Sequence, residues 1–191
     1  MTTATDTPTA PTDGFAEYQA AAATLYGPKT PPKLDAVPPA VAEVRNGDVA
    51  RKLYSAQTAF DGREIEDYFY DRNGLQPPEV AAKNVAELKE VFADVGASRT
   101  DASMFLAEAK GLAKTPPTAE QSKAMQVDAM RQMREVYGPK AYDTLQLAQK
   151  FIKRDPRLAS FLSTTGIGDA PRVVMRMAEL AVDAKARGQI K

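Results

Sequence analysis

The sequence of 191 residues contains no cysteine, no histidine and no tryptophan. Without cysteine the chain has neither disulfides nor a thiolate nucleophile. Without histidine it has neither the commonest general base nor most of the ligand sets that bind zinc. An active site would have to use carboxylates, lysine or a metal ion held by oxygen atoms. We therefore expect no catalytic residue, no metal site and no cofactor, and the sequence predicts a protein that is not an enzyme.

Aromatic side chains and long apolar stretches are also scarce. Aromatic residues make up 7% of the chain, and alanine supplies much of its 43% hydrophobic fraction. Such small side chains favour helices with small local cores over one thick core. No apolar stretch is long enough to span a membrane, and the first residues, MTTATDTPTAPTDG, do not have the basic and apolar parts of a signal peptide. We expect a soluble protein that is not exported and makes no membrane contact.

The formal net charge is zero, but the two parts of the chain differ in sign. Residues 139–191 carry ten lysines and arginines and five acidic residues, a difference of +5. Residues 1–138 carry fifteen basic and twenty acidic residues, a difference of −5. This asymmetry indicates an acidic body and a basic carboxy-terminal module.

The spacing of apolar residues is helical, and no segment alternates apolar and polar residues as a strand does. We predict an all-α fold of elongated or loosely bundled helices, with a helix–turn–helix-like module at the carboxy terminus. Proline-rich and glycine-rich stretches separate the parts. The predicted organisation is a disordered tail at 1–13, a short tethered helix at 14–27, a proline-rich linker at 28–40, a helical body at 41–138 and the basic module at 139–191.

Capping signals place several helix ends. Gly96 ends one helix, and Ser98 or Thr100 begins the next. Thr118 and Gln121 have the spacing of a capping box for a longer helix that Gly138 ends. Three further helices are expected over 140–153, 156–163 and 170–185.

One apolar stripe has coiled-coil spacing. Its residues alternate spacings of four and three over about two heptads. The stripe either packs on a neighbouring helix of the same chain or pairs with a second copy, and the first alternative suits its short length better. We nevertheless take it as a candidate for self-association, together with the helix at 127–137. The stripe consists of Ala81, Val85, Leu88, Phe92 and Val95.

The segment REIEDYFYD, residues 63–71, places carboxylates beside aromatic residues. Paired carboxylates can hold a metal ion or act as an acid and a base. The favoured interpretation is a solvated helix face that carries Glu66 and Asp67, while Ile65, Tyr68 and Phe69 pack inward.

Near the carboxy terminus, STTGIGDAPRVV contains two glycines one residue apart. A dinucleotide-binding loop would need a preceding strand and a third small residue, and a Walker-type loop would need Gly-Lys-Ser/Thr; none of these is present. We interpret the stretch as a corner between two helices. Gly166 adopts the left-handed conformation, Gly168 permits a sharp turn, Asp169 caps the last helix and Pro171 lies in its first turn.

Such a corner could dock on DNA, with Arg172 and Arg176 reaching the duplex. The asparagine or glutamine expected for reading adenine is missing there, and a charge of +5 is modest for DNA binding, so DNA is the lesser alternative. An acidic, partly apolar patch on a protein suits the module better. The candidate partner-binding residues are Lys150, Lys153, Arg154, Arg157, Arg172, Arg176, Lys185 and Arg187.

Several stretches taken together resemble the capsid assembly scaffolding proteins of tailed bacteriophages. These are the Thr/Ala/Pro tail, AAATLYG, VPPAVAEVRNGDVARKLYSAQ and the closing DPRLASFLSTTGIGDAPRVVMRMAELA. The resemblance is concentrated in residues 18–58 and 135–182. The resemblance implies a helical homo-oligomer that binds the major capsid protein through a basic carboxy-terminal element and directs procapsid formation. The portal protein is a further candidate partner. It also implies a location in the host cytoplasm, inside the procapsid or virion.

The capsid contacts that the resemblance implies are Arg154, Arg157, Arg172, Arg176, Lys185 and Arg187. The chain departs from the family in its frequent prolines and glycines, which interrupt any long coiled coil. Two alternatives therefore stay open. One is a structural virion protein retained inside the head or at the portal or head–tail vertex, and the other is a helix–turn–helix DNA-binding regulator.

Overall fold

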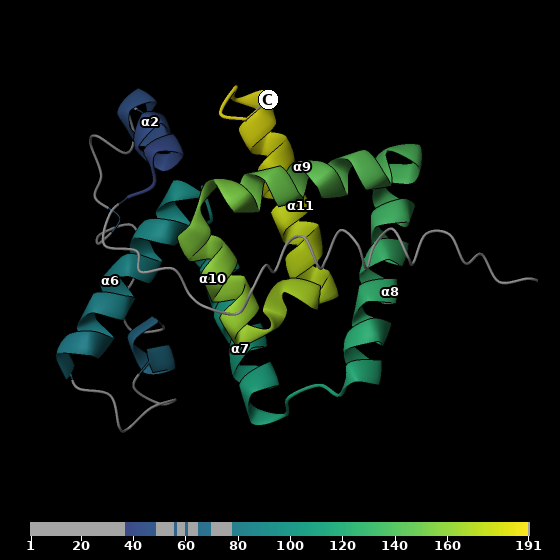
Figure 1. The fold of residues 1–191 in the computed structure, drawn as a ribbon, viewed down its shortest axis with the longest axis horizontal. Coiled ribbons are helices and arrows are strands. Elements are labelled where there is room, and N and C mark those ends of the chain that lie inside the picture. Colours follow the sequence, from purple (N-terminus) through teal and green to yellow (C-terminus); the bar gives the residue numbers. More distant parts are fainter. Residues whose placement is uncertain (1–36, 49–55, 57–59, 61–64, 70–77, 191) are drawn as a thin grey trace, which may run out of the picture.

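The computed structural model describes residues 37–48, 56, 60, 65–69 and 78–190. Within these ranges all regular structure is helical, which confirms the all-α prediction (Figure 1). The predicted tail, the tethered helix and most of the linker lie outside them. The helices are α2 (Pro39–Gly47), α6 (Pro78–Asp94), α7 (Arg99–Lys114), α8 (Ala119–Tyr137), α9 (Ala141–Arg154), α10 (Pro156–Thr165) and α11 (Pro171–Ala186), with 3-10 turns η1 (Gly138–Lys140) and η2 (Ile167–Asp169).

Local capping chemistry sets the ends of these helices, largely as predicted. The Ser98 side chain accepts a hydrogen bond from the Asp101 N–H, and Asp101 bonds back to the Ser98 N–H at 2.7 Å, so α7 begins with a capping box. Thr118 and Gln121 form the same reciprocal pair at the start of α8. After α6, Gly96 takes a φ of 70°, and the next amide bonds back to the Phe92 carbonyl at 2.9 Å.

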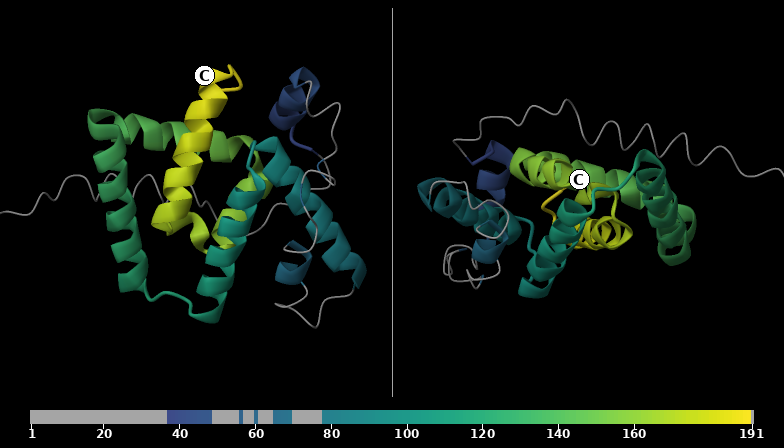
Figure 2. Two further views of the ribbon diagram at one scale, coloured as in Figure 1. Left: turned by 180° about the vertical axis from the view of Figure 1, so that it is seen from behind. Right: turned by 90° about the horizontal axis from the view of Figure 1, so that it is seen from below.

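Residues 119–190 form a self-packed region, which we call the C-terminal unit. Its central helix is α11, which packs against both α9 and α8 (Figures 1 and 2). Ala129 and Met133 of α8 are fully buried in this unit, as are Met177 and Ala178 of α11. The predicted module boundary at 138/139 therefore falls inside a packed region, because α8 belongs to the same core as α9 and α11.

The other part of the core lies between α6, α7, Phe60 and residues 65–69. Phe92 lies at its centre, with the rings of Phe60, Phe105 and Phe161 all within about 6 Å of its own centroid. All five residues of the predicted stripe at 81–95 are buried in the chain itself. The stripe therefore packs on the chain's own helices, and its prediction as a surface for a second copy was wrong.

Two further sequence predictions concern exposed helix faces. On α8, Val127 and Val136 are 51% and 64% exposed, but they lie nine positions apart, which puts them on opposite sides of the helix. They form no shared stripe, and a role of α8 in self-association stays a prediction. In residues 65–69, Ile65 and Tyr68 are buried while the two carboxylates point outward, as expected. None of the helices in the described ranges has the length and hydropathy needed to cross a bilayer.

Candidate functional site

The corner between α10 and α11 is built by the glycine-containing stretch. Gly166 has a φ of 74°, which is the predicted left-handed conformation, and Ile167 is fully buried behind it. Gly168 lies within η2. Pro171 occupies the first turn of α11 as predicted, but the capping residue is Ala170, with no side-chain cap. The prediction that Asp169 caps α11 was wrong, because η2 places this residue one position too early.

Asp169 instead lies half-buried where η2 contacts α7, α8, α10 and α11. Its Oδ1 atom is buried and has no hydrogen-bond partner. Burial raises the pKa of Asp169 above its ordinary value, and a hydrogen bond with the Gln126 side chain opposes this rise only in part. A charged carboxylate is therefore a source of instability at the corner.

We predict that Asp169→Asn raises the melting temperature at about pH 7. The pKa of Asp169 is higher in the folded chain than in the unfolded chain, so the folded state is penalised when pH lies above both values. The penalty disappears as pH falls through the folded pKa, and the amide avoids it at every pH. The advantage of the variant should therefore shrink at about pH 4, as measured by thermal unfolding followed by circular dichroism.

Asp143→Asn is the control for this prediction, because it removes an exposed carboxylate from the first turn of α9. Its negative charge is favourable near the helix N-terminus, so its loss should not raise the melting temperature. A variant of Asp169 that is less stable than the wild type at neutral pH would show that the carboxylate stabilises the corner.

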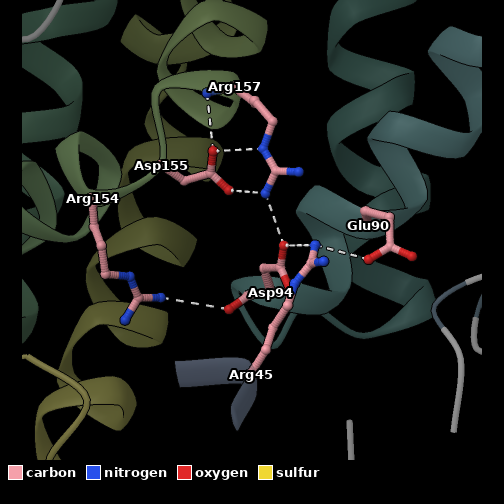
Figure 3. A network of polar contacts seen from close by, with 6 residues as sticks. All are labelled: Arg45, Glu90, Asp94, Arg154, Asp155 and Arg157. Carbon is pink, nitrogen blue, oxygen red and sulfur yellow. Dashed lines mark hydrogen bonds and ion pairs between the residues drawn. The ribbon is translucent and has the colours of Figure 1, made fainter. Parts of the chain in front are cut away.

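A second group of charged side chains joins distant parts of the chain around Asp94, and we call it the Asp94 network (Figure 3). The Asp94 side chain, in the last turn of α6, is only 1% exposed. Its carboxylate accepts hydrogen bonds from Arg45 Nε at 2.6 Å and from Arg157 Nη2 at 2.8 Å. Arg45 also pairs with Glu90 at 2.8 Å. One buried carboxylate thus connects α2, α6 and α10.

Asp155 completes the network at the start of α10. Its side chain caps the helix by accepting the Arg157 N–H at 3.0 Å, and it also pairs with the Arg157 guanidinium at 2.7 Å. Arg154 donates to the Gln189 and Asp94 carbonyls at 3.4 and 3.5 Å and lies over the Phe151 ring. Burial lowers the pKa of Arg154, and the charge of Arg187 adds to this effect.

Arg176 has an internal role as well. It forms two hydrogen bonds to the Asp101 carboxylate, at 2.7 and 2.9 Å, and a third to Glu179 at 2.6 Å. Burial alone would raise the pKa of Asp101, but the bonds from Arg176 and Ser98 outweigh it and hold that pKa below its ordinary value. The pair holds α11 against the start of α7.

The eight predicted partner-binding residues therefore divide into two groups. Arg157, whose side chain is 7% exposed, and the half-buried Arg154 and Arg176 hold the fold together, so predicting them as partner contacts was wrong. Arg172 is 74% exposed and has one long contact, 3.4 Å to Glu108. The remaining four are exposed, and none forms an ion pair with another residue that the structure describes. These four, which we call the basic face, are Lys150, Lys153, Lys185 and Arg187.

The basic face lies where the carboxy-terminal ends of α9 and α11 meet. The hydrogen bond from Arg154, the last residue of α9, to the Gln189 carbonyl just beyond α11 joins these two ends. In Figure 1 α11 crosses α9, and its carboxy-terminal end lies at the top of the molecule. The arrangement presents positive charge on rigid helices and can bind an acidic surface.

The sequence contained a signal for the Asp94 network that its interpretation missed. A carboxylate in the last turn of a helix faces the negative end of the helix dipole, which is unfavourable unless a cation lies nearby. Asp94 occupies such a position in α6, immediately before the buried Val95. An acidic residue there indicates a basic partner from elsewhere in the chain.

In the described part of the chain no group of three or more aspartate or glutamate side chains is placed to hold a metal ion. Comparison of the chain with protein-family models, with curated proteins and with solved structures finds no match.

Proposed function

We propose that this chain is a capsid assembly scaffolding protein of a tailed bacteriophage, which binds the major capsid protein and has no enzymatic activity. The observation that carries the proposal is the basic face, a set of exposed cations on a unit whose helices pack tightly against one another. A rigid, positively charged docking surface suits reversible binding to an acidic partner, because charge steers the encounter and salt weakens it. The order of the sequence motifs supports the same assignment.

The contacts of α11 favour this function over DNA binding. A recognition helix reads DNA with its first turns, where the arginines of α11 are Arg172 and Arg176. Arg176 is engaged by Asp101 and Glu179, which leaves Arg172 as the exposed arginine of that region. The cations of the basic face lie instead at the opposite end of α11 and on α9.

The proposal is tested by mixing the purified chain with the cognate major capsid protein at low and at high salt. We expect co-sedimenting complexes and closed shells at low salt, and loss of both at high salt. Lys150→Glu with Lys153→Glu reverses two charges of the basic face and should abolish the complex. A deletion of residues 155–191 is a poor test, because it removes the buried Leu158 and Leu162 and all of α11.

The matched control is Lys114→Glu with Lys140→Glu, which changes the net charge equally. Both lysines are exposed and lie outside the basic face. This variant should form shells as the wild type does. No complex with the intact chain, or equal loss in both variants, would contradict the proposal. A chain that is as abundant in mature virions as in procapsids would be a retained structural protein.

A further inference from the structure

The basic face has a counterpart of opposite charge on the same molecule. Glu66 and Asp67 are exposed in the helical residues 65–69, and Glu79 is exposed in the first turn of α6. Residues 65–69 lie beside α6 in the ribbon views, and Ile65 and Tyr68 belong to the same hydrophobic core as Val85 and Leu88 (Figures 1 and 2). None of these three carboxylates forms an ion pair with another described residue. We call Glu66, Asp67 and Glu79 the acidic end.

The two charged regions lie at the two ends of α6, because Glu79 is in its first turn whereas Arg187 lies beside Gly96, just after its last residue. In Figure 1 residues 65–69 and the first turns of α6 lie at the bottom left, whereas α9 and the end of α11 lie at the top. The view from behind in Figure 2 shows the same separation. The fold therefore separates these two groups of opposite charge.

We propose that copies of this chain associate head to tail at low ionic strength, with the basic face of one copy against the acidic end of the next. The net charge of zero leaves no overall repulsion between copies, while the separated charges attract. Such an interface joins two different surfaces, so it builds rings or open chains of copies. This head-to-tail interface takes the place of the apolar stripe at 81–95 as the candidate surface for self-association, because that stripe is buried in the chain itself.

The test uses the full chain alone, freed of nucleic acid by nuclease treatment, in sedimentation velocity experiments. At about 20 mM salt charges interact over about 20 Å, whereas at about 500 mM they are screened within about 4 Å. We expect the average sedimentation coefficient to rise with protein concentration at low salt and to stay constant at high salt. A chain that is monomeric at every concentration at low salt would overturn the proposal.

Charge-reversed variants test which surfaces meet. Changing all four cations of the basic face to glutamate (Lys150→Glu, Lys153→Glu, Lys185→Glu and Arg187→Glu) makes both ends acidic. Glu66→Lys with Asp67→Lys makes both ends basic. Each variant alone should self-associate at least about ten-fold more weakly than the wild type, because like charges then face each other. An equimolar mixture of the two should associate again, because opposite charges are restored at every contact. A mixture that stays monomeric, or a variant that associates like the wild type, would overturn the head-to-tail arrangement.

This experiment contains no capsid protein, so its outcome is independent of the function proposed above. All six substituted side chains are exposed, and matching circular dichroism spectra and melting temperatures would show that the variants fold. The variant Glu66→Lys with Asp67→Lys keeps the basic face intact. It should still bind the capsid protein, which separates self-association from partner binding.

Discussion

Replacing Asp94 with asparagine should lower the free energy of unfolding by about 3 kcal/mol or more. Asp94 is the shared partner of Arg45 and Arg157, and both it and Arg157 are almost fully buried. Removing one member of a buried ion pair leaves a desolvated charge without its counterion, and this costs more than the pair itself contributes. Most natural domains have only 5–15 kcal/mol of stability, so the loss should be a large fraction of the total.

Chemical unfolding in urea, followed by circular dichroism, measures this effect. The control is Asp67→Asn, which removes an equal charge from an exposed site and should change stability by no more than about 0.5 kcal/mol. High salt should not reproduce the effect of Asp94→Asn, because buried pairs are screened much less than exposed ones. A variant as stable as the wild type would show that Asp155 alone satisfies Arg157 and that α2 is held by other contacts.

Replacing Phe92 with alanine should cost about 3–5 kcal/mol, through the lost burial of the ring and the cavity that remains. Phe92 is fully buried and contacts three other phenylalanine rings, so no single neighbour can fill the space. The effect should appear in the stability of the monomer. Self-association should persist in the folded variant, because Phe92 is remote from solvent.

This prediction separates the two interpretations of the stripe at 81–95. Val80→Ala, at an exposed position of the same helix, is the control and should change stability by no more than about 0.5 kcal/mol. Sedimentation at low salt and urea unfolding would be measured on all three proteins. An intermolecular stripe would show the reverse pattern, with association lost in Phe92→Ala while the stability of the monomer is unchanged.

Features that depend on neighbouring residues could be read from the sequence. The capping boxes at Ser98 and Thr118 each need a partner only three residues away, and both are present. The glycines that end α6 and α10 take left-handed conformations because few other residues do so without strain. Helix periodicity is local in the same sense, and the expected helices from 140 onward begin and end within two residues of the observed ones.

Features that depend on distant residues could not be read in this way. Arg157 and Arg176 looked like surface charges because their partners, Asp94 and Asp101, lie 63 and 75 positions earlier in the chain. Because basic residues are mostly exposed, the sequence predicts that these two arginines contact a partner protein. The prediction that Asp169 caps α11 was wrong for a different reason, since the 3-10 turn η2 includes Asp169 and the helix begins one residue later than expected. Tertiary contacts decided which cations remain on the basic face.

The central position of α11 also bears on how the protein is made. Because α11 packs against both α8 and α9, those helices cannot fully bury their apolar faces until synthesis has passed Ala184. A nascent chain that has reached only α10 lacks the helix on which both α8 and α9 pack, so the apolar surface of those two contacts stays exposed to solvent. Transiently exposed apolar surface of this kind promotes aggregation. A chain whose synthesis stops before α11 would therefore be prone to aggregation and would be a substrate for chaperones or proteases.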